Sequence, residues 1–160
     1  MSIKRGNKLK NLIILTLLFL IPQLSMAAGL VNDMQGCQGV IQFVDKKLDT
    51  APDRYGPKEV TTVRQGLQAY NDYIQSDIVT PGLLKFTSGD QAKATVLQNQ
   101  VDTYIGTVVS QLNTRYPQNR LFTDHAILIN NCAKKAVPSG QDLDALKQAL
   151  QTMIELAKLN

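Results

Sequence analysis

The chain has 160 residues and a mass of 17.7 kDa, which leaves room for one domain. Apolar residues make up 44% of it and charged residues 19%, a composition that supports a packed core and excludes wholesale disorder. With two cysteines and one histidine, the chain cannot build the usual zinc site of four Cys or His ligands on its own.

The N-terminal residues have the pattern of a bacterial secretory signal. Residues 1–10 carry four basic side chains and no acid, residues 12–21 are apolar apart from one threonine, and small residues suited to cleavage follow Pro22. The apolar run is about half of the ~20 residues that span a bilayer. We therefore expect a cleaved leader over 1–27, no permanent membrane anchor, and one helical domain over 28–160 in the periplasm or outside the cell.

Removal of the leader changes the charge of the chain. The formal net charge of +4 comes from 17 basic and 13 acidic residues, and the leader holds four of the basic ones and no acid. The remainder has 13 of each sign, so it lacks the basic surface that a nucleic acid or an anionic membrane surface would need. We expect no nucleic-acid partner.

Cys37 and Cys132 are the only cysteines. An even pair in an exported chain is first interpreted as a disulfide, and with two cysteines the pairing is fixed. A redox-active pair would favour a Cys-x-x-Cys spacing, which is absent. The sequence therefore predicts a structural bridge between Cys37 and Cys132.

Apolar residues recur every three or four positions throughout the remaining chain, which predicts helices, and no stretch alternates as a strand would. The first expected helix runs over 31–48, and the second begins at Pro57 and ends at Thr80-Pro81-Gly82. The third begins after a cap at Ser88 or Asp90 and ends at about Tyr116. The fourth runs over 121–136, and the fifth begins with a capping box at 139–142 and ends at about Leu159. A short apolar plug over 83–86 would lie in a connection. This pattern predicts an all-α, up-and-down bundle of four to five amphipathic helices, with the disulfide joining the first helix to the fourth inside the core.

Three single residues carry further expectations. Tyr104 lies on an apolar stripe, as Tyr70 does, and both should be in the core. Tyr73 lies off its stripe, which makes it a candidate for a partner surface, although a half-buried structural tyrosine is the simpler expectation. His125, at the first turn of its helix, should pack partly inward and partly in water.

Sites for chemistry are not evident. The nucleophile motif G-x-S-x-G, the metal motif H-E-x-x-H and calcium loops are absent, so we predict no catalytic, metal-binding or cofactor-binding residues and no enzyme. Met34 and His125 are of the two residue types, methionine and histidine, that hold a non-covalent haem in some four-helix bundles. However, Met34 lies on the apolar stripe of the first expected helix, where packing explains it, and we expect no cofactor.

The order of features resembles the periplasmic acid-stress chaperones of the HdeA type. The resemblance rests on Cys37 in the first helix, on residues 128–135 around Cys132, on the break at Pro138 and on the final helix from Leu143. It covers the ends of the domain, whereas the central helices are much longer here. It implies a small helical protein that loosens in acid and shields client proteins, with no catalytic residues.

A second resemblance is to the Rap/Tai-type immunity proteins of type VI secretion, whose additional cysteines are missing here. The matching segments are Tyr104-Ile105, Tyr116-Pro117, 126–129 and Val137-Pro138. This resemblance implies direct neutralisation of a toxin in the periplasm.

Together, these features predict an exported, non-enzymatic protein that binds protein partners, with its oligomeric state open. A periplasmic stress chaperone is the first expectation, and an immunity or inhibitor protein that neutralises a periplasmic toxin or enzyme is the alternative. Acid would neutralise the 13 carboxylates and leave 13 bases and His125 charged, so the bundle would repel itself at low pH.

Overall fold

The computed structural model describes residues 23–50, 53 and 55–159, with side chains from residue 29 onward. The elements are α2 (Gln23–Asp49), α3 (Pro57–Tyr73), the π-helical turn η1 (Ile74–Val79), α4 (Thr80–Phe86), α5 (Gln91–Arg115), α6 (Thr123–Lys135) and α7 (Gly140–Lys158). No strand occurs among the described residues. Apart from the start of α2, the predicted leader lies outside them.

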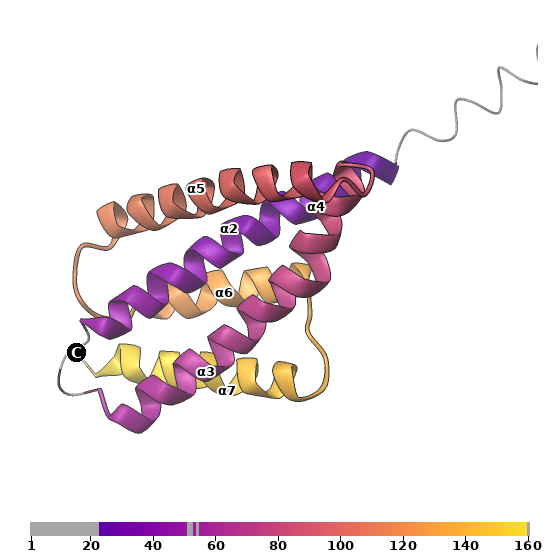
Figure 1. The fold of residues 1–160 in the computed structure, drawn as a ribbon. Helices are drawn as coiled ribbons and strands as arrows, with labels where there is room; N and C mark the ends of the chain where they lie inside the picture. The colour runs from indigo at the N-terminus through magenta and orange to yellow at the C-terminus, as the bar shows by residue number, and fades with distance from the viewer. Residues whose placement is uncertain (1–22, 51–52, 54, 160) are drawn as a thin grey trace, which may run out of the picture.

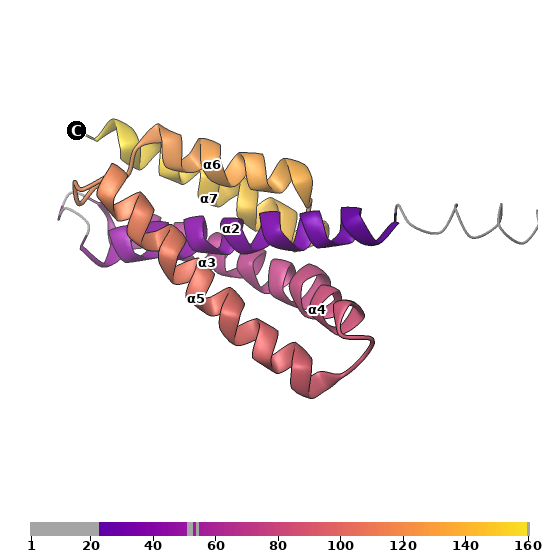
Figure 2. The same cartoon turned by 90° about the horizontal axis from the view of Figure 1, so that it is seen from above.

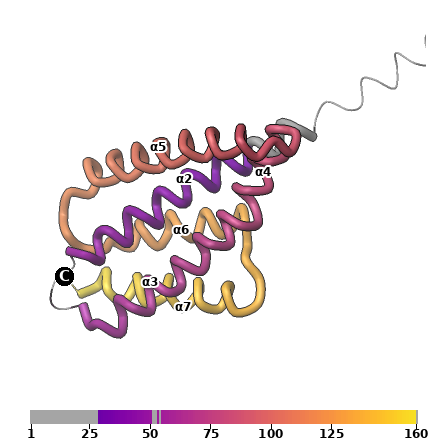
Figure 3. Tube along the Cα trace, in the orientation of Figure 1, coloured from indigo at the N-terminus to yellow at the C-terminus, as the bar shows by residue number. Residues whose placement is uncertain are grey.

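The predicted all-α bundle is confirmed. The chain runs back and forth along one direction, and successive long helices are antiparallel (Figures 1 and 3). α2 is the central helix and contacts α3, η1, α4, α5 and α6. In the view of Figure 2, α6 and α7 lie above α2, and α4 and α5 lie below it. α7 completes the bundle by packing along α3 and α6.

The predicted disulfide joins α2 to α6. The Cys37 and Cys132 sulfurs are 2.05 Å apart and their Cα atoms are 5.8 Å apart. Both side chains are buried, as expected from their place on the apolar stripes. The bridge therefore ties the central helix to a neighbour that begins more than seventy residues after α2 ends, counted from Asp49 to Thr123.

The prediction that Thr80-Pro81-Gly82 ends the second helix is wrong. Residues 57–86 form one continuous helical path through α3, η1 and α4. The backbone N–H of Thr80 bonds the carbonyl of Gln75, five residues back, instead of four. Because Pro81 has no N–H and its ring clashes with an α-helical carbonyl, the wider π-turn ahead of it is what lets the helix continue. The expected apolar plug at 83–86 consequently lies in α4, where Leu83 is buried and Phe86 is exposed.

Of the caps predicted for α5 and α7, the one at α5 is formed and the one at α7 is not. Asp90 caps α5 as expected, because its carboxylate accepts a hydrogen bond from the Lys93 backbone N–H at 3.1 Å. The capping box expected at the start of α7 is not formed: Ser139 makes no side-chain capping bond. The next residue, Gly140, has a φ of +56°, a conformation that a residue with a side chain rarely adopts.

Gly66 sets the close approach of α3 to α7. A Cβ atom at this position would lie 2.7 Å from the Ala149 Cβ and still closer to the Ala145 backbone carbonyl. We expect Gly66→Ala to force the two helices apart and to lower the free energy of unfolding by about 1–3 kcal/mol, measured by urea denaturation.

Gly106 provides the matched control, because it is an exposed glycine in α5 with nothing within 4 Å of a built Cβ. Gly106→Ala should raise stability by roughly 0.5–1 kcal/mol through helix propensity alone. A Gly66→Ala protein as stable as the parent would show that the α3–α7 contact is not limited by the glycine.

Candidate functional site

His125 lies in a closed aromatic cluster formed by α2, the end of α5 and the start of α6. Its side chain is completely buried, so the expectation of a partly solvated histidine is wrong. The imidazole packs edge-on against the rings of Tyr116, Phe43 and Phe122, with centroids 4.7, 5.1 and 5.5 Å away. We refer to these four side chains as the His125 cluster.

The hydrogen bonds of His125 fix its tautomer. Nδ1 accepts a long hydrogen bond of 3.4 Å from the backbone N–H of Phe122, so the neutral ring carries its proton on Nε2. Nε2 is buried and has no hydrogen-bond partner. A buried donor without an acceptor costs free energy, and a second proton on the ring would add a charge to the same apolar site.

The surroundings of His125 favour its neutral form. Burial lowers its pKa to about 4, Asp124 acts in the opposite direction, and Lys47 lowers the pKa further. Lys47 is itself buried, with its ammonium 5.3 Å from the centre of the Phe43 ring, and burial also lowers its pKa. The cluster is therefore an apolar site that resists protonation at neutral pH.

The structure keeps the two possible haem ligands apart. Met34 and His125 are both fully buried. His125 packs against Phe43, which lies nine residues after Met34 on α2, or about 13 Å along the helix axis. The two side chains thus do not converge on one metal position, and aromatic rings fill the space beside the imidazole. The residues present do not fit a haem held by this pair.

An apolar groove lies between α2, α4 and α5, where α2 contributes Val31, Asn32 and Gln35 to its lining. Its volume is about 380 Å³. The apolar lining consists of Val31, Leu83, Phe86, Leu97, Val101 and Tyr104. Tyr104 is 48% exposed at the groove, so the prediction that it belongs to the core is wrong, and Phe86 is 70% exposed. We call this feature the α2–α4–α5 groove.

A polar cleft of about 370 Å³ lies farther along the bundle, between α2, α3 and α5. A chain of amides runs beside it: Gln38 Nε2 donates to Gln75 Oε1 at 3.0 Å, Gln75 Nε2 to Gln98 Oε1 at 3.0 Å, and Gln98 Nε2 to Asp102 at 2.9 Å. Because an ionised carboxylate only accepts, Asp102 fixes the direction of every amide in the chain. The buried Oε1 of Gln38 is left without a partner at the far end.

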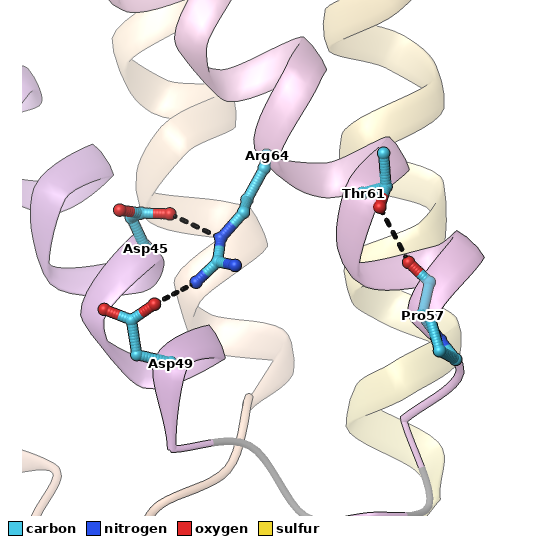
Figure 4. Close-up of polar contacts among 5 residues, drawn as sticks. All are labelled: Asp45, Asp49, Pro57, Thr61 and Arg64. Carbon is cyan, nitrogen blue, oxygen red and sulfur yellow. Dashed lines mark hydrogen bonds and ion pairs between the residues drawn. The ribbon is translucent and has the colours of Figure 1, made fainter.

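Arg64 joins α3 to the end of α2 at the same cleft. Its Nε donates to Asp45 at 2.8 Å and its Nη2 donates to Asp49, as Figure 4 shows. In the same view, one turn earlier in α3, the Thr61 hydroxyl donates to the Pro57 carbonyl at 2.8 Å. Because these ion-paired groups are substantially exposed, they link α2 and α3 at the surface but add little to the stability of the fold.

Tyr73 lies at the margin of the core. It is half-buried, and its ring stacks on that of Tyr70 with centroids 6.2 Å apart. Tyr70 is fully buried, as predicted, and its hydroxyl donates to the Ala136 carbonyl at 3.0 Å. The packing on Tyr70 gives Tyr73 a structural role, and its part in a partner surface stays a prediction.

The described residues hold neither a cluster suited to a metal ion nor a helix suited to a membrane span. No group of three or more His, Cys, Asp or Glu side chains in this part of the chain is placed to hold a metal ion. Within the same residues, no helix has the length and apolar character needed to cross a bilayer.

The comparisons with known proteins add no relative. No protein-family model, curated protein or solved structure matches the chain.

The sequence reasoning missed both the groove and the amide chain. A partial signal was the polar row of Gln35, Gln38 and Gln42 beside the apolar stripe of α2, in which Gln38 belongs to the amide chain and Gln42 lines the same cleft.

Proposed function

We propose that this chain is an exported, non-enzymatic protein that binds other proteins, and that it acts as a stress chaperone whose bundle loosens in acid. The observation that carries the proposal is the His125 cluster: a fully buried, neutral histidine enclosed by three aromatic rings. Such a group lowers the free energy of unfolding of a helical bundle when the pH falls.

Proton binding links this cluster to stability. An unfolded histidine takes up a proton near pH 6.5, whereas His125 in the folded chain does so only near pH 4. Between these values the unfolded chain binds the additional proton, and the free energy of unfolding falls as the pH falls. Below pH 4, the folded cluster must either accept a charge among apolar rings or open.

Loss of carboxylate charge would act in the same direction. Ion pairs from Asp33 to Lys135, and from Asp45 and Asp49 to Arg64, link α2 to α6 and α3. Protonation of the carboxylates removes these pairs and leaves an excess of like charges that repel. Since the pairs are exposed and individually weak, His125 is the stronger of the two effects.

The disulfide would limit how far the bundle opens. Cys37 and Cys132 keep α2 beside α6 even when the packing around them loosens. Opening would then expose apolar faces, among them the aromatic side chains around His125, without releasing a fully extended chain. Exposed apolar surface on a compact state is what a client-shielding protein needs.

The test is the aggregation of a client protein at pH 2–3 and at pH 7, followed by light scattering. We expect suppression at the low pH and none at pH 7, with an inert protein of the same size as the control. Suppression no better than that of the inert protein at low pH would refute the chaperone proposal. A tight stoichiometric partner recovered from a periplasmic extract at neutral pH would favour the immunity alternative in its place.

A further inference from the structure

The α2–α4–α5 groove has an apolar floor formed by close packing of its three helices. Leu83 and Val101 are buried at its base, with 8% and 5% of their surfaces exposed. Gly82 brings α4 against α2, because a Cβ there would collide with the Val31 side chain. Phe86 also lines the groove and is largely exposed. An apolar chain laid in the groove would cover surface that now faces water.

The charges around the groove favour an anion. Among the described residues of the lining, Lys85 is the only charged one, and none is a carboxylate. Lys85 makes no ion pair with any residue of the described part of the chain. The other lysine at this end, Lys93, is already paired with Asp90 at 3.0 Å. A ligand with a negative group beside Lys85 would therefore find an unpaired cation.

The size of the groove fits a small ligand. Its volume of about 380 Å³ lies at the lower end of the roughly 300–1,000 Å³ typical of small-molecule sites. The remaining lining residues, Asn32, Gln35 and Gln100, are uncharged and polar. One apolar chain with one anionic head therefore matches the lining in size, polarity and charge.

We propose that the α2–α4–α5 groove binds a single-chain anionic amphiphile, with the alkyl chain against Leu83, Phe86 and Val101 and the acidic head beside Lys85. This site is separate from the His125 cluster and does not depend on the chaperone proposal.

The experiment is isothermal titration calorimetry of the disulfide-bonded, leader-free protein at pH 7 with dodecanoate, kept below its micelle concentration. We expect saturable binding of one dodecanoate per chain. Shortening the chain to decanoate or octanoate should weaken binding about fourfold for each buried methylene removed. Dodecyltrimethylammonium has an alkyl chain of the same length with the opposite head charge, and it should bind at least threefold more weakly.

Variants test whether the binding is in the groove. Lys85→Gln should weaken dodecanoate binding about threefold to fivefold, and Lys85→Glu should weaken it further. Phe86→Ala should weaken it about fivefold or more through lost apolar contact. Lys58→Gln, at an exposed lysine on α3, is the matched control and should leave the affinity unchanged. Because Lys85, Phe86 and Lys58 are all exposed, thermal unfolding should show that each variant remains folded.

Three outcomes would overturn the inference. The first is the absence of saturable one-to-one binding. The second is equal affinity for the anionic and cationic amphiphiles, which would mean a plain apolar surface that also suits a protein segment. The third is wild-type affinity in both Lys85→Glu and Phe86→Ala, which would place the bound molecule elsewhere.

Discussion

Replacing both cysteines, as Cys37→Ala with Cys132→Ala, should lower the free energy of unfolding by about 4 kcal/mol at pH 7, measured by urea denaturation. The bridge closes a loop with a sequence separation of 95 residues. Loop-closure entropy gives about 4.7 kcal/mol for a loop of ~100 residues, and strain in a folded protein reduces such values. Since small domains are stable by only about 5–15 kcal/mol, this is the largest effect that we expect from any single feature.

Chemical reduction of the wild-type protein separates the covalent effect from the loss of two buried side chains. Reduced wild type should lose most of the same free energy, while its buried thiols keep the packing between α2 and α6. The double alanine variant should be slightly less stable than the reduced protein, because it also leaves small cavities. A loss below about 1 kcal/mol on reduction would show that the bridge does not constrain the unfolded chain as proposed.

The apolar stripes predicted the helical bundle correctly, because spacing along a helix decides which side chains share a face. Along α2, every apolar residue spaced by three or four from Val31 to Leu48 is buried, namely Val31, Met34, Cys37, Ile41, Val44 and Leu48. The stripe nevertheless understated the burial of this helix, since Phe43 and the polar side chains of Gln35 and Gln38 are buried as well. α2 is surrounded by other helices on several sides, and the width of burial follows from neighbours that a local pattern does not contain.

The misplaced helix end at Pro81 has a different cause. Rules for proline assume the α-helical register, in which proline loses a hydrogen bond and clashes with the preceding turn. The π-turn η1 changes that register just before Pro81, and nothing in the local sequence marks it. The consequence reaches the surface, because the continued helix carries Leu83, Lys85 and Phe86 into the groove.

The expected positions of Tyr104 and His125 were the reverse of those in the structure. Tyr104 lies on the apolar stripe of α5, but α5 packs mainly against α2 and α4, and one edge of its stripe faces solvent. His125 follows the polar pair Thr123-Asp124 at the start of α6, yet Phe43 and Tyr116 converge on it from α2 and the end of α5. Contact between segments that are distant in sequence depends on the tertiary fold, and the pattern of a short stretch of sequence does not reveal it.

Replacing His125 by phenylalanine should remove a large part of the dependence of stability on pH. In the wild type, the pKa of about 4 in the folded state and 6.5 in the unfolded state means that stability is complete above pH 6.5 and is lost progressively down to pH 4. The shift corresponds to about 3 kcal/mol. Phenylalanine keeps an aromatic ring in the cluster and does not titrate. We therefore expect the free energy of unfolding of His125→Phe to fall by about 3 kcal/mol less between pH 7 and pH 4, measured by urea denaturation at each pH.

Tyr116→Phe is the matched control, because it keeps His125 and the ring that packs on it but removes the hydroxyl that donates to Asp124 at 3.3 Å. This variant should lose a small amount of stability and retain most of the wild-type slope between pH 7 and pH 4. The difference in slope between the two variants isolates the proton of His125 from the packing of the cluster. A wild-type slope in His125→Phe would show that the carboxylates alone make the bundle acid-labile, and the His125 cluster would then have no part in the proposed loosening.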